Sequence, residues 1–137
     1  MEARLVACAQ LVSIDQRTNS LSLFNLIEEI NLPAFPFAFP YMTVAVLLLR
    51  EANEPSAPAN LSLRLFMGDQ QVFSRDLTAN FQQHLRMRLV VDIQAIVFQT
   101  PGIMRVTVNQ DDRELGAWKI YVNNIGPGAA VVQVPPS

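Results

Sequence analysis

The segment LPAFPFAFPYMTVAVLLLR, residues 32–50, joins a stretch rich in proline and phenylalanine to a long apolar run. In an extended chain successive side chains alternate faces, so Phe35, Phe37 and Phe39 point one way. Proline lacks a backbone donor and suits a connection between two sheets. Residues 32–41 therefore predict a crossover whose phenylalanines cover an open end or edge of a β-sandwich, and residues 41–50 predict a buried strand. A PxxP ligand is the alternative, but Leu32 and Tyr41 are not the basic flanks of such ligands.

Short alternating segments continue on both sides of this stretch. They predict strands at 4–14, 20–30, 61–67, 71–77, 84–93, 103–110 and 115–122. Residues 94–102 predict a crossing to the other sheet that inserts Phe98 into the core. About eight strands separated by turns, with no long amphipathic helix, are typical of a sandwich or barrel. The fold class expected is therefore all-β: a single-domain, two-sheet antiparallel β-sandwich over residues 1–123, immunoglobulin-like or jelly-roll-like.

Composition excludes several classes of function. Half of the 137 residues are hydrophobic, 16% are charged and the net charge is -2, so we expect a packed domain that binds neither nucleic acid nor an anionic membrane. No apolar run reaches the roughly 18–20 residues of a membrane-spanning helix. The box LVAC, residues 5–8, is preceded only by MEAR, which is too short for a signal peptide. We expect a cytoplasmic protein.

Catalytic and metal-binding patterns are weak. His84 and Cys8 are the single histidine and cysteine, and Cys8 lies in an apolar run where nothing nearby would lower its pKa. Asp111, Asp112 and Glu114 lack the alternation and glycine of a calcium loop and indicate a solvated turn. No glycine-rich phosphate loop is present. We therefore expect no enzyme activity, no cofactor and no metal.

One set of polar residues takes the outward parity of its strands. If those strands share a sheet, its face is positively charged and could hold an acidic ligand or partner. The alternative is an ordinary solvated sheet face. The residues are Arg64, Arg86, Arg88, Arg105, Thr107, Lys119 and Tyr121.

Two hypotheses for function follow. The first is a non-catalytic binding or assembly module with a protein partner or a second copy. The alternative is a small-ligand carrier or enzyme whose site is built from EANEPSAPAN (51–60) and QTPG (99–102). The segment 124–137 is expected to be a flexible or strand-adding tail. Its AAVVQV (129–134), which follows Gly126-Pro127-Gly128, would add to an edge strand of its own domain or of a neighbour. We favour the neighbour, which would form a dimer.

Three stretches resemble a known family: SLSLFNLI (20–27), INLPAFPFAFP (30–40) and FQTPGIMRVTVNQDDRELGAWKIYV (98–122). Together the pattern is similar to a family of small bacterial proteins of unknown function, over roughly residues 3–123. The resemblance implies a β-sandwich and brings no catalytic residues.

Overall fold

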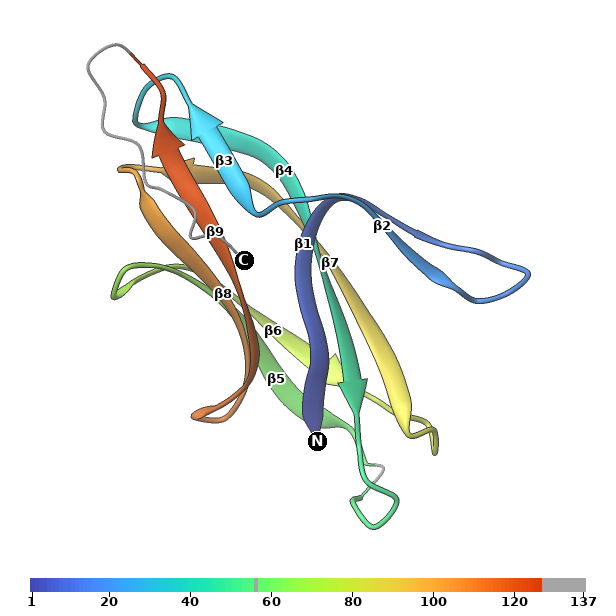
Figure 1. Ribbon diagram of the computed structural model, residues 1–137. Coiled ribbons are helices and arrows are strands. Elements are labelled where there is room, and N and C mark those ends of the chain that lie inside the picture. Colours follow the sequence, from blue (N-terminus) through green and yellow to red (C-terminus); the bar gives the residue numbers. More distant parts are fainter. Residues whose placement is uncertain (56, 127–137) are drawn as a thin grey trace.

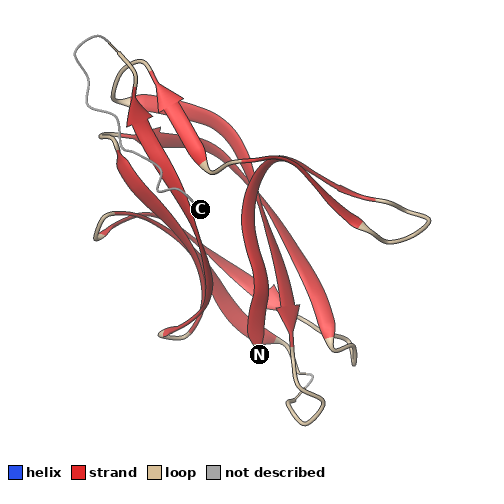
Figure 2. Ribbon diagram, viewed as in Figure 1, coloured by secondary structure: helices blue, strands red, loops and turns tan. Residues whose placement is uncertain are grey.

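The computed structural model describes residues 1–55 and 57–126, and in these ranges the chain forms strands and no helix (Figures 1 and 2). None of the described residues therefore belongs to a helix long and apolar enough to cross a membrane. The strands are β1 (Glu2–Ile14), β2 (Leu21–Leu26), β3 (Glu29–Leu32), β4 (Phe37–Leu49), β5 (Ala59–Met67), β6 (Gln70–Ala79), β7 (Arg86–Phe98), β8 (Gly102–Gln110) and β9 (Arg113–Asn124).

The strands form two sheets that enclose one core, which confirms the predicted two-sheet all-β fold. The four-stranded sheet has the order β2-β1-β4-β7, and the five-stranded sheet has the order β3-β9-β8-β5-β6. All pairs are antiparallel except β3 with β9, which is parallel. Side chains at alternate positions meet between the sheets, among them Val44 and Leu48 from one sheet and Leu63, Val106 and Ile120 from the other. Burying such apolar groups is the main term that stabilises the fold.

The proline- and phenylalanine-rich segment does connect the two sheets, as predicted. It leads from β3 in the five-stranded sheet to β4 in the four-stranded sheet. Phe35, Phe37 and Phe39 are half-buried and pack against the core, whereas Ala34 and Ala38 are exposed. The crossover is shorter than predicted, because β4 already begins at Phe37 and pairs there with β7.

Two boundaries differ from the sequence-based expectation. Residues 20–30 are two strands in different sheets, β2 and β3, because the chain changes sheets at Ile27 and Glu28. Ile27 is held at both ends: its N–H donates to Cys8 O, and its carbonyl accepts from Trp118 Nε1 at 2.8 Å. Residues 94–98 do not cross over but continue β7; the change of sheet follows Phe98, whose ring is fully buried as predicted.

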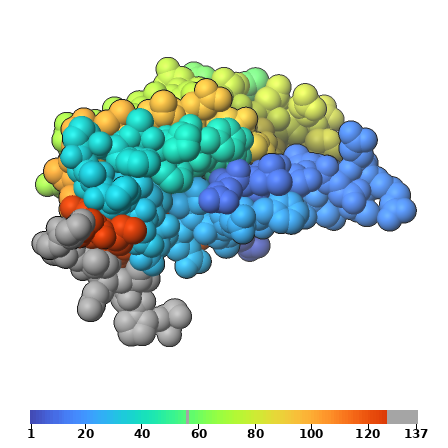
Figure 3. Space-filling model, turned by 90° about the horizontal axis from the view of Figure 1, so that it is seen from above, coloured from blue at the N-terminus to red at the C-terminus, as the bar shows by residue number. Residues whose placement is uncertain are grey.

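The strand β1 changes its partner in mid-course. From Glu2 to Ala9 it pairs with β4 inside the sandwich, and from Ala9 to Ile14 it pairs with β2. Beyond Ala9 the hairpin leaves the body of the molecule and extends to one side (Figures 1 and 3). We call residues 10–26 the arm and the rest of the two sheets the body.

Candidate functional site

The arm exposes apolar side chains on both of its faces. Leu11 lies opposite Phe24 on one face, and Ile14 lies opposite Leu21 on the other. Exposed fractions are 56% for Leu11, 48% for Phe24, 47% for Leu26 and 44% for Ile14. The only charged residues of the arm, Asp15 and Arg17, lie in its turn. Exposed apolar side chains on a pair of strand segments without a charged residue, here 10–14 and 21–26, are typical of a surface that contacts another molecule.

The turn of the arm is locally well built. The Asp15 carboxylate accepts the backbone N–H groups of Arg17 at 2.8 Å and Thr18 at 3.0 Å. Both hydrogen bonds lower the pKa of the Asp15 carboxyl because they stabilise its charged form, and the bond from Thr18 has the largest effect. Asn19 lies in left-handed backbone, which asparagine tolerates better than most residues. The sequence DQRTNS therefore supplies hydrogen bonds and a backbone conformation that favour the turn of the hairpin.

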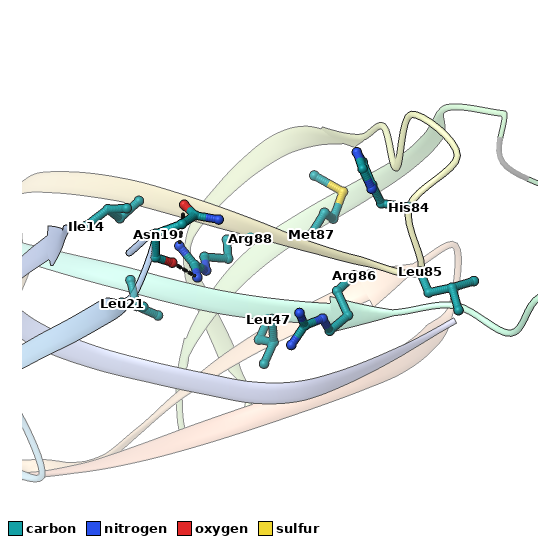
Figure 4. A pocket seen from close by; sticks show the side chains of 9 residues that line it. All are labelled: Ile14, Asn19, Leu21, Leu47, His84, Leu85, Arg86, Met87 and Arg88. Carbon is teal, nitrogen blue, oxygen red and sulfur yellow. Dashed lines mark hydrogen bonds between the residues drawn. The ribbon is translucent and has the colours of Figure 1, made fainter. Parts of the chain in front are cut away.

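A cavity of about 600 Å³, which we call the notch, lies between the arm and the body. Leu47 and Leu85 form part of its apolar lining, and Arg86 lies on its wall. Arg88 reaches across to the arm, where its guanidinium donates to the main-chain and side-chain oxygens of Asn19 (Figure 4). The lining residues are Ile14, Asn19, Leu21, Leu47, His84, Leu85, Arg86, Met87 and Arg88.

The predicted polar strip is divided between the two sheets. Arg86 and Arg88 belong to β7 in the four-stranded sheet. Arg64, Arg105, Lys119 and Tyr121 lie on β5, β8 and β9 in the five-stranded sheet, with Arg105 opposite Lys119 and Arg64 opposite Thr107. Arg105 also makes an ion pair with Glu114 at 2.6 Å, which offsets its charge. The residues therefore do not share one face. Alternation shows to which side of a strand a residue points, but not which strands are neighbours, so the sequence could not predict this division.

A sequence profile of a family of unknown function, DUF6941, matches residues 5–123 of the chain. The chain belongs to this family. The resemblance noted from the sequence is thereby confirmed, and the matched region contains the whole arm. No curated protein sequence matches the chain.

Several solved structures show distant likeness. The chain is similar to a β-glucosidase from Listeria innocua in complex with isofagomine, with 10% identity and a TM-score of 0.47 over 90% of this chain and 17% of the other. A second likeness is to the alkylpurine DNA glycosylase AlkC of Pseudomonas fluorescens bound to DNA that contains an abasic site analog. It has 12% identity and a TM-score of 0.42 over 85% of this chain and 30% of the other. The chain therefore spans less than a third of either protein, and scores this low transfer no function.

The sequence did not indicate a hydrogen-bonded group on the outer face of the four-stranded sheet. Tyr41, Thr43 and Asp92 meet there, with both hydroxyl groups 2.9 Å from the Asp92 carboxylate and 2.9 Å from each other. Tyr41 and Thr43 are two residues apart in β4, and Asp92 lies opposite Thr43 in β7. Only the register of β4 against β7 brings these three side chains together, so no local sequence motif could have predicted the group.

The single thiol and the single imidazole lie in different parts of the molecule. Cys8 is fully buried in the core, and this burial raises the pKa of its thiol to about 12. His84 is exposed and lines the notch. Among the described residues, no three His, Cys, Asp or Glu side chains gather as metal ligands would.

The two loops of the alternative hypothesis do not meet. Residues 51–55 follow the end of β4 at Leu49, whereas residues 99–102 follow the end of β7, where Phe98 lies opposite Phe37 at the start of β4 (Figure 1). They are separated by a 13-residue strand, roughly 40 Å of extended chain. Gln99–Gly102 instead line a cavity of about 610 Å³ with the turn between β5 and β6.

Proposed function

We propose that the protein is a non-catalytic binding and assembly module whose contact surface is the arm. One observation carries the proposal: β1 leaves the sandwich at Ala9 and presents uncharged, half-exposed apolar residues on a two-stranded extension. A two-stranded hairpin by itself is at best marginally stable in water, so a further partner would stabilise the arm. Proteins that do not associate rarely retain such a surface.

The positions of the reactive side chains support a non-catalytic role. A thiol is a nucleophile only as its thiolate, and a pKa of about 12 keeps Cys8 protonated at neutral pH. Its side chain points into the core, whereas His84 lies at the surface, so the histidine cannot activate it as a general base.

Substitution of Phe24 tests the proposal. The Phe24→Ser variant should lose association, both with proteins retained from a lysate of the native host and with itself, as measured by quantitative mass spectrometry and light scattering. The matched control is Val97→Ser, since Val97 is 46% exposed and lies at the far end of β7. If Phe24→Ser associates as the wild type does, the arm is not the contact surface.

A small-ligand carrier is the second candidate, favoured by the cavity that Gln99–Gly102 line with Val72, Val97 and Ile103. These exposed apolar residues would bind an apolar molecule of modest size. Native mass spectrometry of the purified protein would show a bound small molecule that Val97→Ser reduces and Phe24→Ser leaves unchanged. The same two variants therefore separate the two candidates.

A further inference from the structure

Among the described strands, the outermost are β2 and β7 in one sheet and β3 and β6 in the other, and we call these the four edges. The arm has one further open side, along residues 10–14 of β1, which pair with β2 and not with β4. An edge strand presents free N–H and C=O groups that can pair with another chain. Proteins prevent this with charged residues, prolines, bulges or very short edge strands.

Three of the four edges are protected in these ways. β3 is four residues long and is followed by Pro33, and β7 is interrupted by Ala95 in left-handed backbone. Across the gap between the sheets, Arg75 of β6 donates to the main-chain oxygen of Asp92 in β7 at 3.0 Å. The charged residues of these edges are Arg86, Arg88 and Asp92 in β7, Arg75 and Asp76 in β6, and Glu29 in β3.

The fourth edge, β2, has no such protection over its first four residues. Its sequence LSLFNL carries no charge and no proline, and its register with β1 is regular from Leu21 to Phe24. Only Asn25, in left-handed backbone, interrupts it. At the turn, Asp15 N–H donates to Ser20 O, so the alternation of an antiparallel pair turns the N–H and C=O of Leu21 and Leu23 away from β1.

We propose that β2 pairs with β2 of a second copy, antiparallel and across a two-fold axis at Ser22. This inference rests on the proposed function and names the partner of the arm. The segment Leu21-Ser22-Leu23 reads the same in both directions, so two-fold pairing places each leucine opposite a leucine and Ser22 opposite Ser22. Self-complementarity of this kind is what a symmetric dimer requires.

The pairing would also give the arm hydrogen-bond partners and neighbouring strands. The outward N–H and C=O groups of Leu21 and Leu23 would form ladder bonds with those of the second copy. Each two-stranded arm becomes half of a four-stranded sheet, a size at which antiparallel strands become stable. Cross-strand contacts between leucines stabilise such pairs further.

Disulfide trapping tests the register directly. In the proposed dimer, Ser22 faces Ser22 of the second copy in a non-hydrogen-bonded pair, with Cα atoms about 4.5 Å apart, which a disulfide can span. Ser22→Cys should therefore convert most of the protein to a covalent dimer under mild oxidation, as seen on a non-reducing gel. The control is Ser13→Cys: Ser13 lies opposite Ser22, is equally exposed, and belongs to β1, the other strand of the arm, which has no part in the proposed pairing. It should stay monomeric on the same gel.

Equal cross-linking of the two variants, or none for Ser22→Cys, would overturn the pairing. Failure here is distinguishable from failure of the proposed function. If Ser22→Cys does not cross-link while Phe24→Ser still loses association, the arm binds through a face and not through its edge. If Phe24→Ser also associates normally, the arm has neither role.

Discussion

The two halves of β1 have similar sequences and opposite surroundings. RLVACA (4–9) and QLVSI (10–14) are both short apolar segments, yet Val6 and Cys8 are buried while Leu11 is 56% exposed. The first half pairs with β4 and lies over the five-stranded sheet, whereas the second pairs only with β2 among the described strands. Burial in this molecule is thus decided by which strands are adjacent. The same kind of sequence forms core in the body and an exposed apolar surface in the arm.

The largest expected effect is a difference in stability between alanine variants of a buried and of an exposed phenylalanine. Phe98→Ala removes a fully buried ring and should lower the free energy of unfolding by about 3–5 kcal/mol. Phe24→Ala, in the arm, should change it by less than about 0.5 kcal/mol in dilute solution. Urea denaturation of both variants measures the difference. Equal losses would mean that the arm belongs to the same cooperative core as the body.

A smaller effect is expected where β1 and β9 approach closely within the body. A Cβ atom added at Gly116 would lie 2.9 Å from the Cβ of Ala3 and 2.9 Å from a methyl group of Val6. Gly116→Ala should therefore destabilise the protein by about 1–3 kcal/mol through overpacking. Ser22→Thr adds a methyl group in the arm and should be nearly neutral. A neutral Gly116→Ala would show that the first half of β1 can shift as freely as the second.

These contrasts also show what the sequence could and could not predict. Alternation located most of the strands, and the burial of Phe98 was predicted although the position of the crossing was not. Alternation does not specify which strands are neighbours, so the sequence could not decide whether Arg86 and Arg105 share a sheet. They belong to different sheets. The arm was missed for the same reason. Its one sequence signal is the lack of charge in both 5–14 and 20–27.

The AAVVQV tail prediction concerns residues 129–134, which lie outside the described residues. A dimer through that tail therefore stays a prediction. It differs from pairing through β2 in a simple way: truncation after Asn124 would abolish a tail-mediated dimer and leave a β2-mediated dimer intact. Light scattering of the truncated chain distinguishes the two.

The attachment of the arm to the body should have a modest effect. Arg88→Met removes the hydrogen bonds to Asn19, each of which contributes roughly 1 kcal/mol or less at an exposed site. We expect faster amide exchange in the arm with little change in global stability. Arg86→Met is the control, since Arg86 lines the notch without a hydrogen bond to the described part of the arm. Identical exchange in both variants would show that Arg88 does not hold the arm.

The smallest effect concerns pH. The folded-state pKa of Asp15 is lowered, so its contribution to the turn is complete above the ordinary aspartate pKa of about 3.9 and is lost as pH falls through the lowered value. The amide resonances of Arg17 and Thr18 should shift on acidification while core resonances such as Val44 do not. Asp15→Asn, which keeps an acceptor oxygen but no titrating group, should abolish the shift. If the shift persists in that variant, another group causes it.

Amide hydrogen exchange along β1 and β2, measured as a function of protein concentration, tests the central claim most directly. Under the proposed β2 pairing, association stabilises the arm, so the N–H groups of Leu21 and Leu23 should exchange rapidly in dilute solution and become protected as concentration rises. The amides of Val6 and Cys8 should be protected equally at every concentration. The account is contradicted if Leu21 and Leu23 exchange at the same rate throughout, whether fast or slow.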